Sequence, residues 1–388
     1  MADAPSPRGN VRAFGATSFC NDTATEMAYW VLPAFLMSLG AGPEKLGVIE
    51  GIAESVASLA KLGSGYLTDH LPRRKPLVVA GYTLANIVKP ILAIATSWWQ
   101  VLFIRFADRT AKGLRGAPRD VMLAESVERE RLGSAFGLLQ AMDSAGAIAG
   151  PLLAILILRH FDLRAVFWAA AIPGLLAIVI VSLFARETGK AASPKHERQP
   201  IARTKLPASF YGMLVAVTLF SLGNSSDMFL VLRAQDVGIG ATLAPLLGLV
   251  FNIVYTAGSW PAGHLSDRIP RKYVAAAGYA IFAAVYFVFA AAPSRSAIWA
   301  MMAFYGLYYA LTSPVLRALV VDEVPKESRG RALGIFYFAT SVATLLSSVL
   351  TGILWKTYGA AVPLNISAAL ALVSAVLLLG FRSHPVRA

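Results

Sequence analysis

Twelve stretches of this chain are apolar over about 20 residues or more, the length that an α-helix needs to cross the hydrocarbon core of a bilayer. Gly, Pro and charged residues separate these stretches. The predicted spans are residues 12–38, 44–67, 76–96, 99–121, 132–158, 163–185, 207–232, 241–265, 273–292, 296–320, 330–357 and 360–381. Only 15% of the residues are charged, whereas soluble domains have about 25%. The sequence therefore predicts an all-α membrane protein.

One short motif occurs twice, each time between the second and third span of a half. GYLTDHLPRRK begins at Gly65, and GHLSDRIPRKY begins 198 positions later, at Gly263. A motif repeated at about half the chain length indicates an internal duplication. Such duplications are typical of secondary transporters, whose two halves pack around a central site.

The repeat extends beyond this motif. At the same spacing three further pairs match: Arg119 with Arg317, Glu125 with Glu323, and Arg131 with Arg329. In the first helix of each half, Glu26-Met27 matches Asp227-Met228 at a spacing of 201. We expect two six-helix bundles related by a rough two-fold axis, residues 12–185 and 207–382, joined by a polar linker at 186–206.

Positive charge is unevenly distributed among the loops. The net charge is +13, and Lys and Arg gather in alternate loops and at both ends of the chain. This is the positive-inside pattern, which predicts that the tails 1–11 and 383–388 and the linker 186–206 are cytoplasmic. The expected location is the plasma (bacterial inner) membrane, with the lipid bilayer and no nucleic acid as partner.

The duplicated motif resembles the signature of the major facilitator superfamily, G-x-L-x-D-R-x-G-R-[RK]-[RK]. The matching residues are Gly65, Leu67, Asp69, Arg73, Arg74 and Lys75 in the first copy and Gly263, Leu265, Asp267, Arg268, Arg271 and Lys272 in the second. Both copies have Pro in place of the second Gly (Pro72 and Pro270), and His70 replaces an Arg. The resemblance covers the whole chain and implies a bacterial-type, twelve-helix secondary transporter.

Two further signatures of that superfamily are partial. Arg105 stands in the place of its buried helix-4 arginine, and Gly146, Gly150 and Pro151 resemble the helix-5 motif of antiporters. The glycines expected after that Pro are absent. The two glycines are equally consistent with close helix packing through small residues.

The motif residues are also candidates for a cytoplasmic gate. An aspartate near a helix end can cap backbone N–H groups and pair with arginines of an adjacent helix. We expect Asp69 to interact with Arg73 and with the helix-4 residues Arg115 and Arg119. The corresponding group in the second half is Asp267, Arg271 and Arg317. The alternative interpretation is that these charges only set topology.

Several charged residues lie within the predicted spans, where burial of a charge costs on the order of 3 kcal/mol. The candidate proton-coupling acids are Asp22, Glu26, Glu54 and Asp143. Helix 4 carries a charged stripe of Arg105, Asp108, Arg109 and Lys112, in which Asp108 pairs with Arg105 or Arg109 or else serves transport. Lys89 is expected either to pair with Glu54 or Asp143 or to contact the ligand.

Candidate substrate-binding residues lie on the helices that line the cavity in the superfamily. The leading pair is Glu26 and Asp227, which occupy repeat-related positions on helices 1 and 7. Weaker candidates, which helix packing explains equally well, are Tyr29, Asn224, Asn252 and Tyr255, and the cationic stripe adds Arg105 and Arg109.

These features favour a monomeric secondary transporter that works by alternating access and couples protons to export of a small molecule or ion. The alternatives are proton-coupled uptake of an organic anion, export of a metal ion or other cation, and lipid flipping on the same fold. The sequence lacks the H-E-x-x-H, G-x-S-x-G and P-loop motifs, so no enzyme activity is expected. Cys20 is the only cysteine, and we expect neither a cofactor nor a resident metal site.

Overall fold

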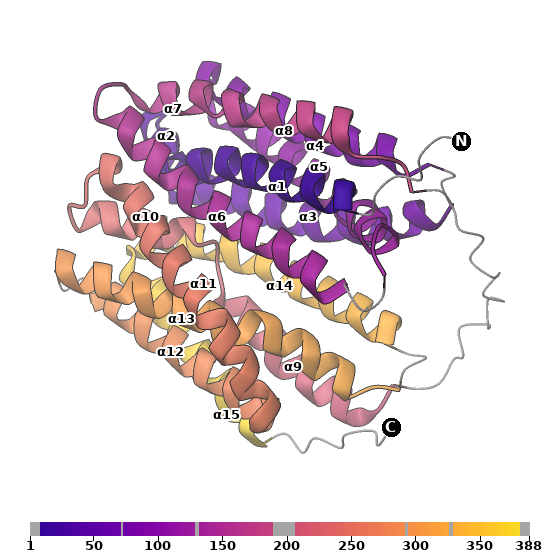
Figure 1. Cartoon of the computed structure of the whole chain (residues 1–388). Helices are drawn as coiled ribbons and strands as arrows, with labels where there is room; N and C mark the ends of the chain where they lie inside the picture. The colour runs from indigo at the N-terminus through magenta and orange to yellow at the C-terminus, as the bar shows by residue number, and fades with distance from the viewer. Residues whose placement is uncertain are drawn as a thin grey trace, which may run out of the picture. The chain divides into compact units, whose positions relative to one another are not determined.

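The computed structural model describes residues 8–70, 73–128, 132–188, 206–291, 294–325 and 329–380. These ranges contain helices and connecting turns and no strand (Figure 1). The α-helices are α1 (Arg8–Tyr29), α2 (Leu32–Ser38), α3 (Pro43–His70), α4 (Lys75–Ile91), α5 (Trp98–Glu125), α6 (Leu132–Leu158), α7 (Leu163–Ala169), α8 (Ala171–Phe184), α9 (Ala208–Gly223), α10 (Met228–Asp236), α11 (Ala244–Arg268), α12 (Arg271–Ala291), α13 (Arg295–Asp322), α14 (Arg329–Tyr358) and α15 (Ala361–Gly380). Short 3₁₀ turns follow α4 at Leu92–Ile94 and precede α11 at Ala241–Leu243.

Eight of the predicted spans coincide with described helical runs that are long and apolar enough to cross a membrane. These runs are Lys75–Ile94, Leu138–Leu158, Leu163–Phe184, Ala208–Asp236, Ala241–Ser266, Arg271–Ala291, Ala332–Tyr358 and Ala361–Gly380. The other four predicted spans are also helical and lie in α1 with α2, α3, α5 and α13. The all-α membrane fold is therefore confirmed, while the count of twelve crossings stays a prediction.

The helical run 208–236 is interrupted in its middle. Helix α9 ends at Gly223, residues 224–226 are not helical, and α10 begins at Met228. Backbone groups freed by such a break must find partners, because an unsatisfied N–H or C=O is costly inside a membrane. One of them is satisfied by a side chain, since the Ser226 N–H donates to Ser348 Oγ at 3.2 Å.

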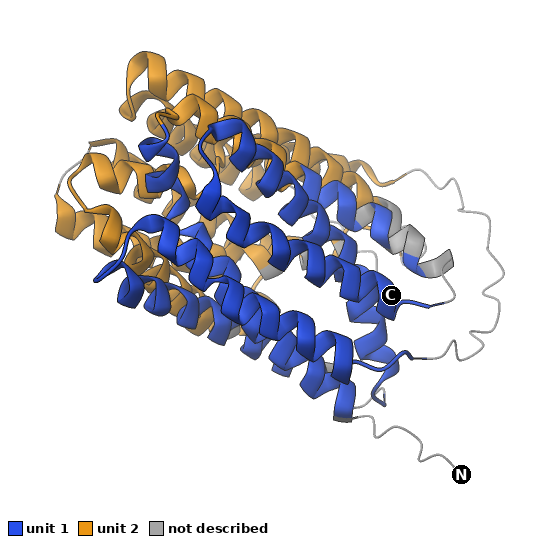
Figure 2. Cartoon of the chain, turned by 90° about the horizontal axis from the view of Figure 1, so that it is seen from above, with its two compact units in different colours: residues 1–39, 56–194 blue, residues 40–55, 195–388 orange. Residues whose placement is uncertain are grey.

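The chain divides into two compact units, coloured separately in Figure 2. Unit 1 consists of residues 1–39 and 56–194, and unit 2 consists of residues 40–55 and 195–388. The predicted bundles were separated only at the linker. By its contacts, however, the first part of α3 groups with unit 2 rather than with the half that encodes it.

Contacts within unit 2 explain this grouping. Ser55 Oγ donates to the Ser341 carbonyl at 3.0 Å, and Lys356 Nζ pairs with Glu44 at 3.0 Å. Between these two points, a Cβ on Gly51 would lie 3.0 Å from the Leu345 carbonyl oxygen. The absence of a side chain at Gly51 therefore lets the first part of α3 lie directly against α14.

The internal repeat is visible as equivalent contacts in the two units. Arg74 pairs with Glu125 in unit 1, and Arg271 pairs with Asp322 in unit 2. Both pairs follow a spacing of 197, one less than the spacing of the duplicated motif. Asp322, rather than Glu323, is therefore the counterpart of Glu125.

A second pair of contacts follows the same spacing. Lys75 Nζ donates to the Ser182 carbonyl at 2.8 Å, and Lys272 Nζ donates to the Leu379 carbonyl at 3.3 Å. Each lysine thus fastens the start of the third helix of its half to the end of the sixth. The duplication extends to individual hydrogen bonds, which supports the two-bundle organisation.

Candidate functional site

The centre of unit 1 is an ion-pair network between α4 and α5. Lys89 Nζ lies 3.3 Å from Asp108 Oδ1, and Arg105 Nη1 lies 3.7 Å from Asp108 Oδ2. All three residues are buried, with exposed fractions of 3 to 6%. The predicted pairing of Asp108 with Arg105 is present. The partner of Lys89 among the described ion pairs is Asp108, so the expected pairing with Glu54 or Asp143 is wrong.

The Lys89 side chain has further partners within α4. Lys89 lies in the last turn of α4, where unpaired carbonyl groups and the helix dipole stabilise a cation. Its Nζ also donates to the Ala85 carbonyl at 3.1 Å and to Asn86 Oδ1 at 3.2 Å. Such partners allow a lysine to remain buried.

A chain of amide side chains connects this network to α1. Asn86 Nδ2 donates to Asn21 Oδ1 at 3.1 Å, and Asn21 Nδ2 donates to Asp22 Oδ1 at 2.9 Å. A continuous series of polar contacts therefore runs from Asp22 through both asparagines to Lys89 and Asp108. The sequence analysis had not identified Asn21 or Asn86, although both are polar residues inside predicted spans.

Glu26 lies one turn beyond Asp22 on α1. Trp30 Nε1 donates to Glu26 Oε2 at 2.7 Å. Asp22, Lys112 and Arg109 are the charged groups that act on Glu26 most strongly. The neighbouring Tyr29 ring lies 5.5 Å from the Arg105 guanidinium carbon and 5.9 Å from that of Arg109. The predicted residues Glu26, Tyr29, Arg105 and Arg109 are therefore brought together.

A pocket opens beside this network. Its lining includes Thr25 and Tyr29 of α1, Lys89 of α4, and Arg105 and Asp108 of α5. Apolar side chains of Ala28, Leu32, Leu92 and Ile104 complete the wall. Pockets with apolar walls and a few convergent polar groups are the usual form of small-molecule sites.

The helix-5 motif packs directly against the acidic face of α1. A Cβ on Gly146 would lie 2.6 Å from the Phe19 carbonyl oxygen and 3.1 Å from the Asp22 Cβ. A Cβ on Gly150 would lie 2.7 Å from the Glu26 Cβ. Neither glycine can carry a side chain without moving α1. The close helix packing expected of these glycines is thus present, while a role in antiport stays a prediction.

Two of the remaining candidates, Arg115 and Arg119, lie beside Tyr82. Arg115 lies over the Tyr82 ring at 4.5 Å, and Arg119 donates to Ser18 Oγ at 3.2 Å. The Arg119 charge also acts on Asp143, whose Oδ1 is buried without a hydrogen-bond partner. Arg73 is exposed. The structure does not describe the side chains of Asp69, Asp267 and Arg317 or the surroundings of the motif glycines Gly65 and Gly263.

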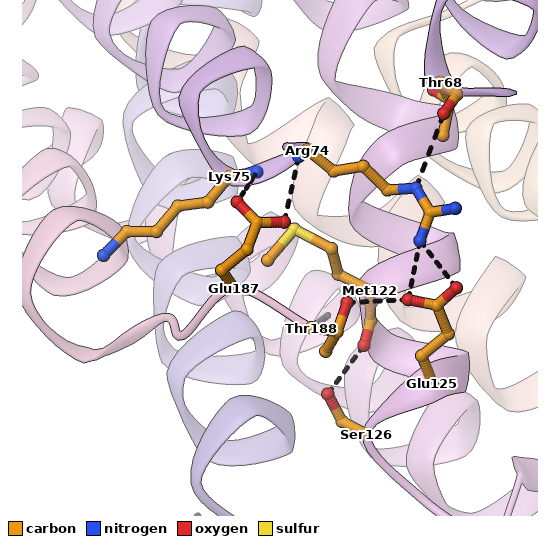
Figure 3. Close-up of polar contacts among 8 residues, drawn as sticks. All are labelled: Thr68, Arg74, Lys75, Met122, Glu125, Ser126, Glu187 and Thr188. Atoms are coloured by element: carbon orange, nitrogen blue, oxygen red, sulfur yellow. Dashed lines mark hydrogen bonds and ion pairs between the residues drawn. The ribbon is translucent and has the colours of Figure 1, made fainter. Parts of the chain in front are cut away.

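Arg74 of the motif belongs to a polar cluster at one end of unit 1 (Figure 3). Its guanidinium contacts both carboxylate oxygens of Glu125 at 2.6 Å. Glu187 accepts the backbone N–H groups of Arg74 and Lys75 at 2.9 and 3.0 Å, and so caps the start of α4. Thr188 Oγ1 donates to Glu125 Oε2 at 2.7 Å. The first residues of the predicted linker are thus fixed to the motif.

The candidate site of unit 2 is built around Asp227, at the break between α9 and α10. Tyr305 OH donates to Asp227 Oδ1 at 2.7 Å, and Tyr309 OH donates to the same oxygen at 3.0 Å. Tyr255 belongs to this group through its ring, which lies 5.8 Å from that of Tyr309. Asn224 lies in the break itself, and Asn252 is buried on α11.

Two further acids lie close to Asp227. The charges of Glu54 and Glu50 both act on it, and Ser226 Oγ lies 3.4 Å from Glu50 Oε2. Glu50 is fully buried and was missed by the sequence analysis, although it precedes Glu54 by one helical turn. Glu50 belongs to the same unit as Asp227, because unit 2 includes residues 40–55.

Among the described residues, no group of three or more His, Cys, Asp or Glu side chains is arranged to hold a metal ion. The acids of each unit are instead surrounded by hydrogen-bond donors, cations or aromatic rings. The candidate site thus combines carboxylates, cationic side chains and aromatic rings.

Comparisons with known proteins agree with this architecture. The Major Facilitator Superfamily profile matches residues 14–232 and 209–388. The chain is 32% identical over 355 residues to an uncharacterized MFS-type transporter, MJ1317, of Methanocaldococcus jannaschii, covering 89% of this chain and 88% of the relative. It is 24% identical over 366 residues to the multi-drug resistance efflux pump PmrA of Streptococcus pneumoniae, covering 89% of this chain and 90% of the pump.

Solved structures show the same fold at low sequence identity. A bacterial homologue of the human lysosomal transporter Spinster, in an inward-facing and occupied conformation, superposes with a TM-score of 0.77 at 13% identity, covering 99% of this chain and 98% of that one. The nucleoside transporter NupG superposes with a TM-score of 0.76 at 14% identity, covering 96% and 98%.

Proposed function

This chain belongs to the Major Facilitator Superfamily, and we propose that it is a proton-coupled exporter of a small solute that works by alternating access. Membership of the family implies transport across a membrane. We propose in addition the direction of transport, its coupling to protons and the roles of individual residues. We further propose that it resides in the plasma (bacterial inner) membrane as a monomer with both termini in the cytoplasm, on the basis of the positive-inside pattern.

The observation that carries the proposal is the polar chain from Asp22 to Asp108. Asp22, Asn21, Asn86, Lys89 and Asp108 are linked by contacts of 2.9 to 3.3 Å. A change in the charge of Asp22 acts on Lys89, because the electrostatic interaction between them is not screened by bulk water. Uptake or release of a proton on α1 can thereby alter the ion pair that lines the pocket.

The packing of α6 supports the choice of these acids for coupling. Gly146 and Gly150 hold α6 against α1 at Asp22 and Glu26, so a movement of either helix changes the surroundings of both carboxylates. Two neighbouring carboxylates disfavour simultaneous ionisation, so the charge of one of them depends on the charge of the other. Asp143 and Glu54 are the next candidates.

Export is favoured over uptake by two observations. The helix-5 residues resemble the antiporter motif, and one relative, PmrA, is named as a multi-drug resistance efflux pump. Uptake of an organic anion remains the second candidate function, because Lys89 and Arg105 place cationic groups in the pocket wall.

The test is transport in proteoliposomes under an imposed pH gradient, after a thermal-shift screen for a solute. Asp22→Asn and Glu26→Gln fix the neutral form while keeping side-chain size and acceptor oxygens. We expect at least one variant to insert normally, lose pH-driven accumulation and retain exchange at equal pH. Asp236→Asn is the matched control, since that acid lies at the end of α10 with its side chain 42% exposed. Normal pH-driven transport by both α1 variants would contradict the coupling role.

A further inference from the structure

We propose that Asp227 and the aromatic rings around it bind an organic cation, a substrate with a protonated amine, a quaternary ammonium or a similar centre attached to an apolar body. The inference rests on the transport function proposed above and names the substrate class of that transporter. It is carried by the geometry of the carboxylate, by the rings and by the neighbouring charges of unit 2.

The carboxylate is held in place but keeps acceptor capacity. Tyr305 and Tyr309 donate to Oδ1, and Tyr309 also lies 3.3 Å from Oδ2. An ionised carboxylate offers about four acceptor positions, so these contacts leave at least one open. Asp227 is partly exposed, because it stands at the break where α9 ends and α10 has not begun. A ligand can therefore reach an acid whose orientation is already fixed.

Aromatic rings from α11 and α13 form a wall beside the acid. The Tyr309 ring lies 5.1 Å from that of Phe251 and 5.4 Å from that of Tyr305. Phe251 and Tyr305 are buried, whereas Tyr255 and Tyr309 are partly exposed. The π faces of such rings attract a cation within about 6 Å, and the attraction increases when water is excluded. A carboxylate combined with several rings favours a cation that also has apolar surface.

The neighbouring charges point to the same ligand. The charged groups acting most strongly on Asp227 are the acids Glu54 and Glu50, so an incoming anion meets repulsion there and a cation meets attraction. These acidic neighbours contrast with the wall of the unit 1 pocket, which includes the cationic residues Lys89 and Arg105.

The experiment compares tetraphenylphosphonium with tetraphenylborate, which have the same shape and opposite charge. The full chain, purified in detergent, is titrated with each ion while its thermal unfolding is followed. We expect tetraphenylphosphonium to raise the unfolding midpoint in a concentration-dependent manner and tetraphenylborate to have no such effect. Benzyltrimethylammonium serves as a smaller cationic probe with the same expected result.

Variants then locate the site. Asp227→Asn keeps an oxygen that accepts from both tyrosines but removes the charge, so it should fold and bind the cation roughly tenfold to a hundredfold more weakly. Tyr309→Leu removes a ring and should weaken binding roughly three- to thirtyfold. Tyr309→Phe keeps the ring and should bind much more tightly than Tyr309→Leu. Asp236→Asn on α10 should bind as the parent does.

Three results would overturn the inference: equal stabilisation by tetraphenylborate, unchanged cation binding by Asp227→Asn, or no binding of either cationic probe. These results are separate from a failure of the proposed function. Proton coupling is judged by the α1 variants in proteoliposomes, which do not alter this site. A chain that couples protons but binds no organic cation would retain the function and lose only the substrate class.

Discussion

The same positions of the internal repeat hold an ion pair in unit 1 and two tyrosines in unit 2. Lys89 and Asp108 are 3.3 Å apart, and at a spacing of 197 their counterparts are Tyr286 and Tyr305, whose ring centres are 6.2 Å apart. The helices that carry them approach in the same way. A Cβ on Gly81 would lie 2.7 Å from the Arg115 Cβ, and a Cβ on Gly278 would lie 2.5 Å from the Thr312 Cγ2.

The comparison shows that the two units share the approach of their helices and differ in the side chains between these helices. The close approach of the third and fourth helices is preserved in both units, because glycine stands at the same repeat position. The side chains between these helices are free to differ. In unit 1 they carry opposite charges, and in unit 2 they are aromatic rings beside Asp227. Under the proposals above, proton coupling belongs to unit 1 and substrate selection to unit 2.

The largest effect is expected from breaking the ion pair. Asp108→Leu leaves Lys89 and Arg105 buried without the acid that they share, and should lower the free energy of unfolding by about 3–5 kcal/mol. Lys89→Met combined with Asp108→Leu should recover part of this loss, because one stranded charge is gone. Thermal unfolding in detergent measures both. A double variant that is less stable than Asp108→Leu alone would contradict an ionic role for these positions.

A smaller effect is expected at the equivalent tyrosines. Tyr305→Phe removes the 2.7 Å hydrogen bond to Asp227 and should cost about 1.5–3 kcal/mol, the usual range for a hydrogen bond to a charged group. Tyr279→Phe, on the same helix as Tyr286, is the matched control. Its hydroxyl is buried without a hydrogen-bond partner, so its removal should change stability by less than about 0.5 kcal/mol. Equal losses in the two variants would show that the hydrogen bond to Asp227 adds nothing specific.

The smallest effect concerns the paired arginines of the motif. The Arg74 side chain is 12% exposed and lies beside a helix start capped by Glu187, whereas that of Arg271 is 26% exposed. Arg74→Gln should cost about 1 kcal/mol and Arg271→Gln less than about 0.5 kcal/mol. High salt should reduce the stability loss of both variants, and the reduction should be larger for Arg271→Gln. A larger loss of stability in Arg271→Gln than in Arg74→Gln would contradict this prediction.

Much of the fold could be predicted from the sequence, because span length and hydropathy are read directly along the chain. The pairing of Asp108 with Arg105 was also predictable, since both lie on one face of α5 three residues apart. The partner of Lys89 could not be predicted in this way. Helical periodicity gives the face of a residue but not the helix that packs against it, so it did not identify which acid lies opposite Lys89.

The tyrosines around Asp227 were missed for a different reason. Tyr305 and Tyr309 stand in an aromatic run of an apolar helix, where most such residues only fill space. Their spacing of one helical turn was the available signal, since it places both hydroxyls on one face. The one-residue change in repeat spacing between the motif and the helices that follow likewise could not be read from the motif alone.

Helix α3 gives the duplication an asymmetry that bears on how such a chain could have evolved. Its first part supplies Glu50 to Ser226 and Ser55 to Ser341, so the second half completes its interior with a segment encoded in the first. A gene cut within the linker would yield one fragment that still carries this segment and another that lacks it. The two halves are therefore copies in sequence but not exchangeable modules, and neither could have drifted independently of the other once α3 was shared.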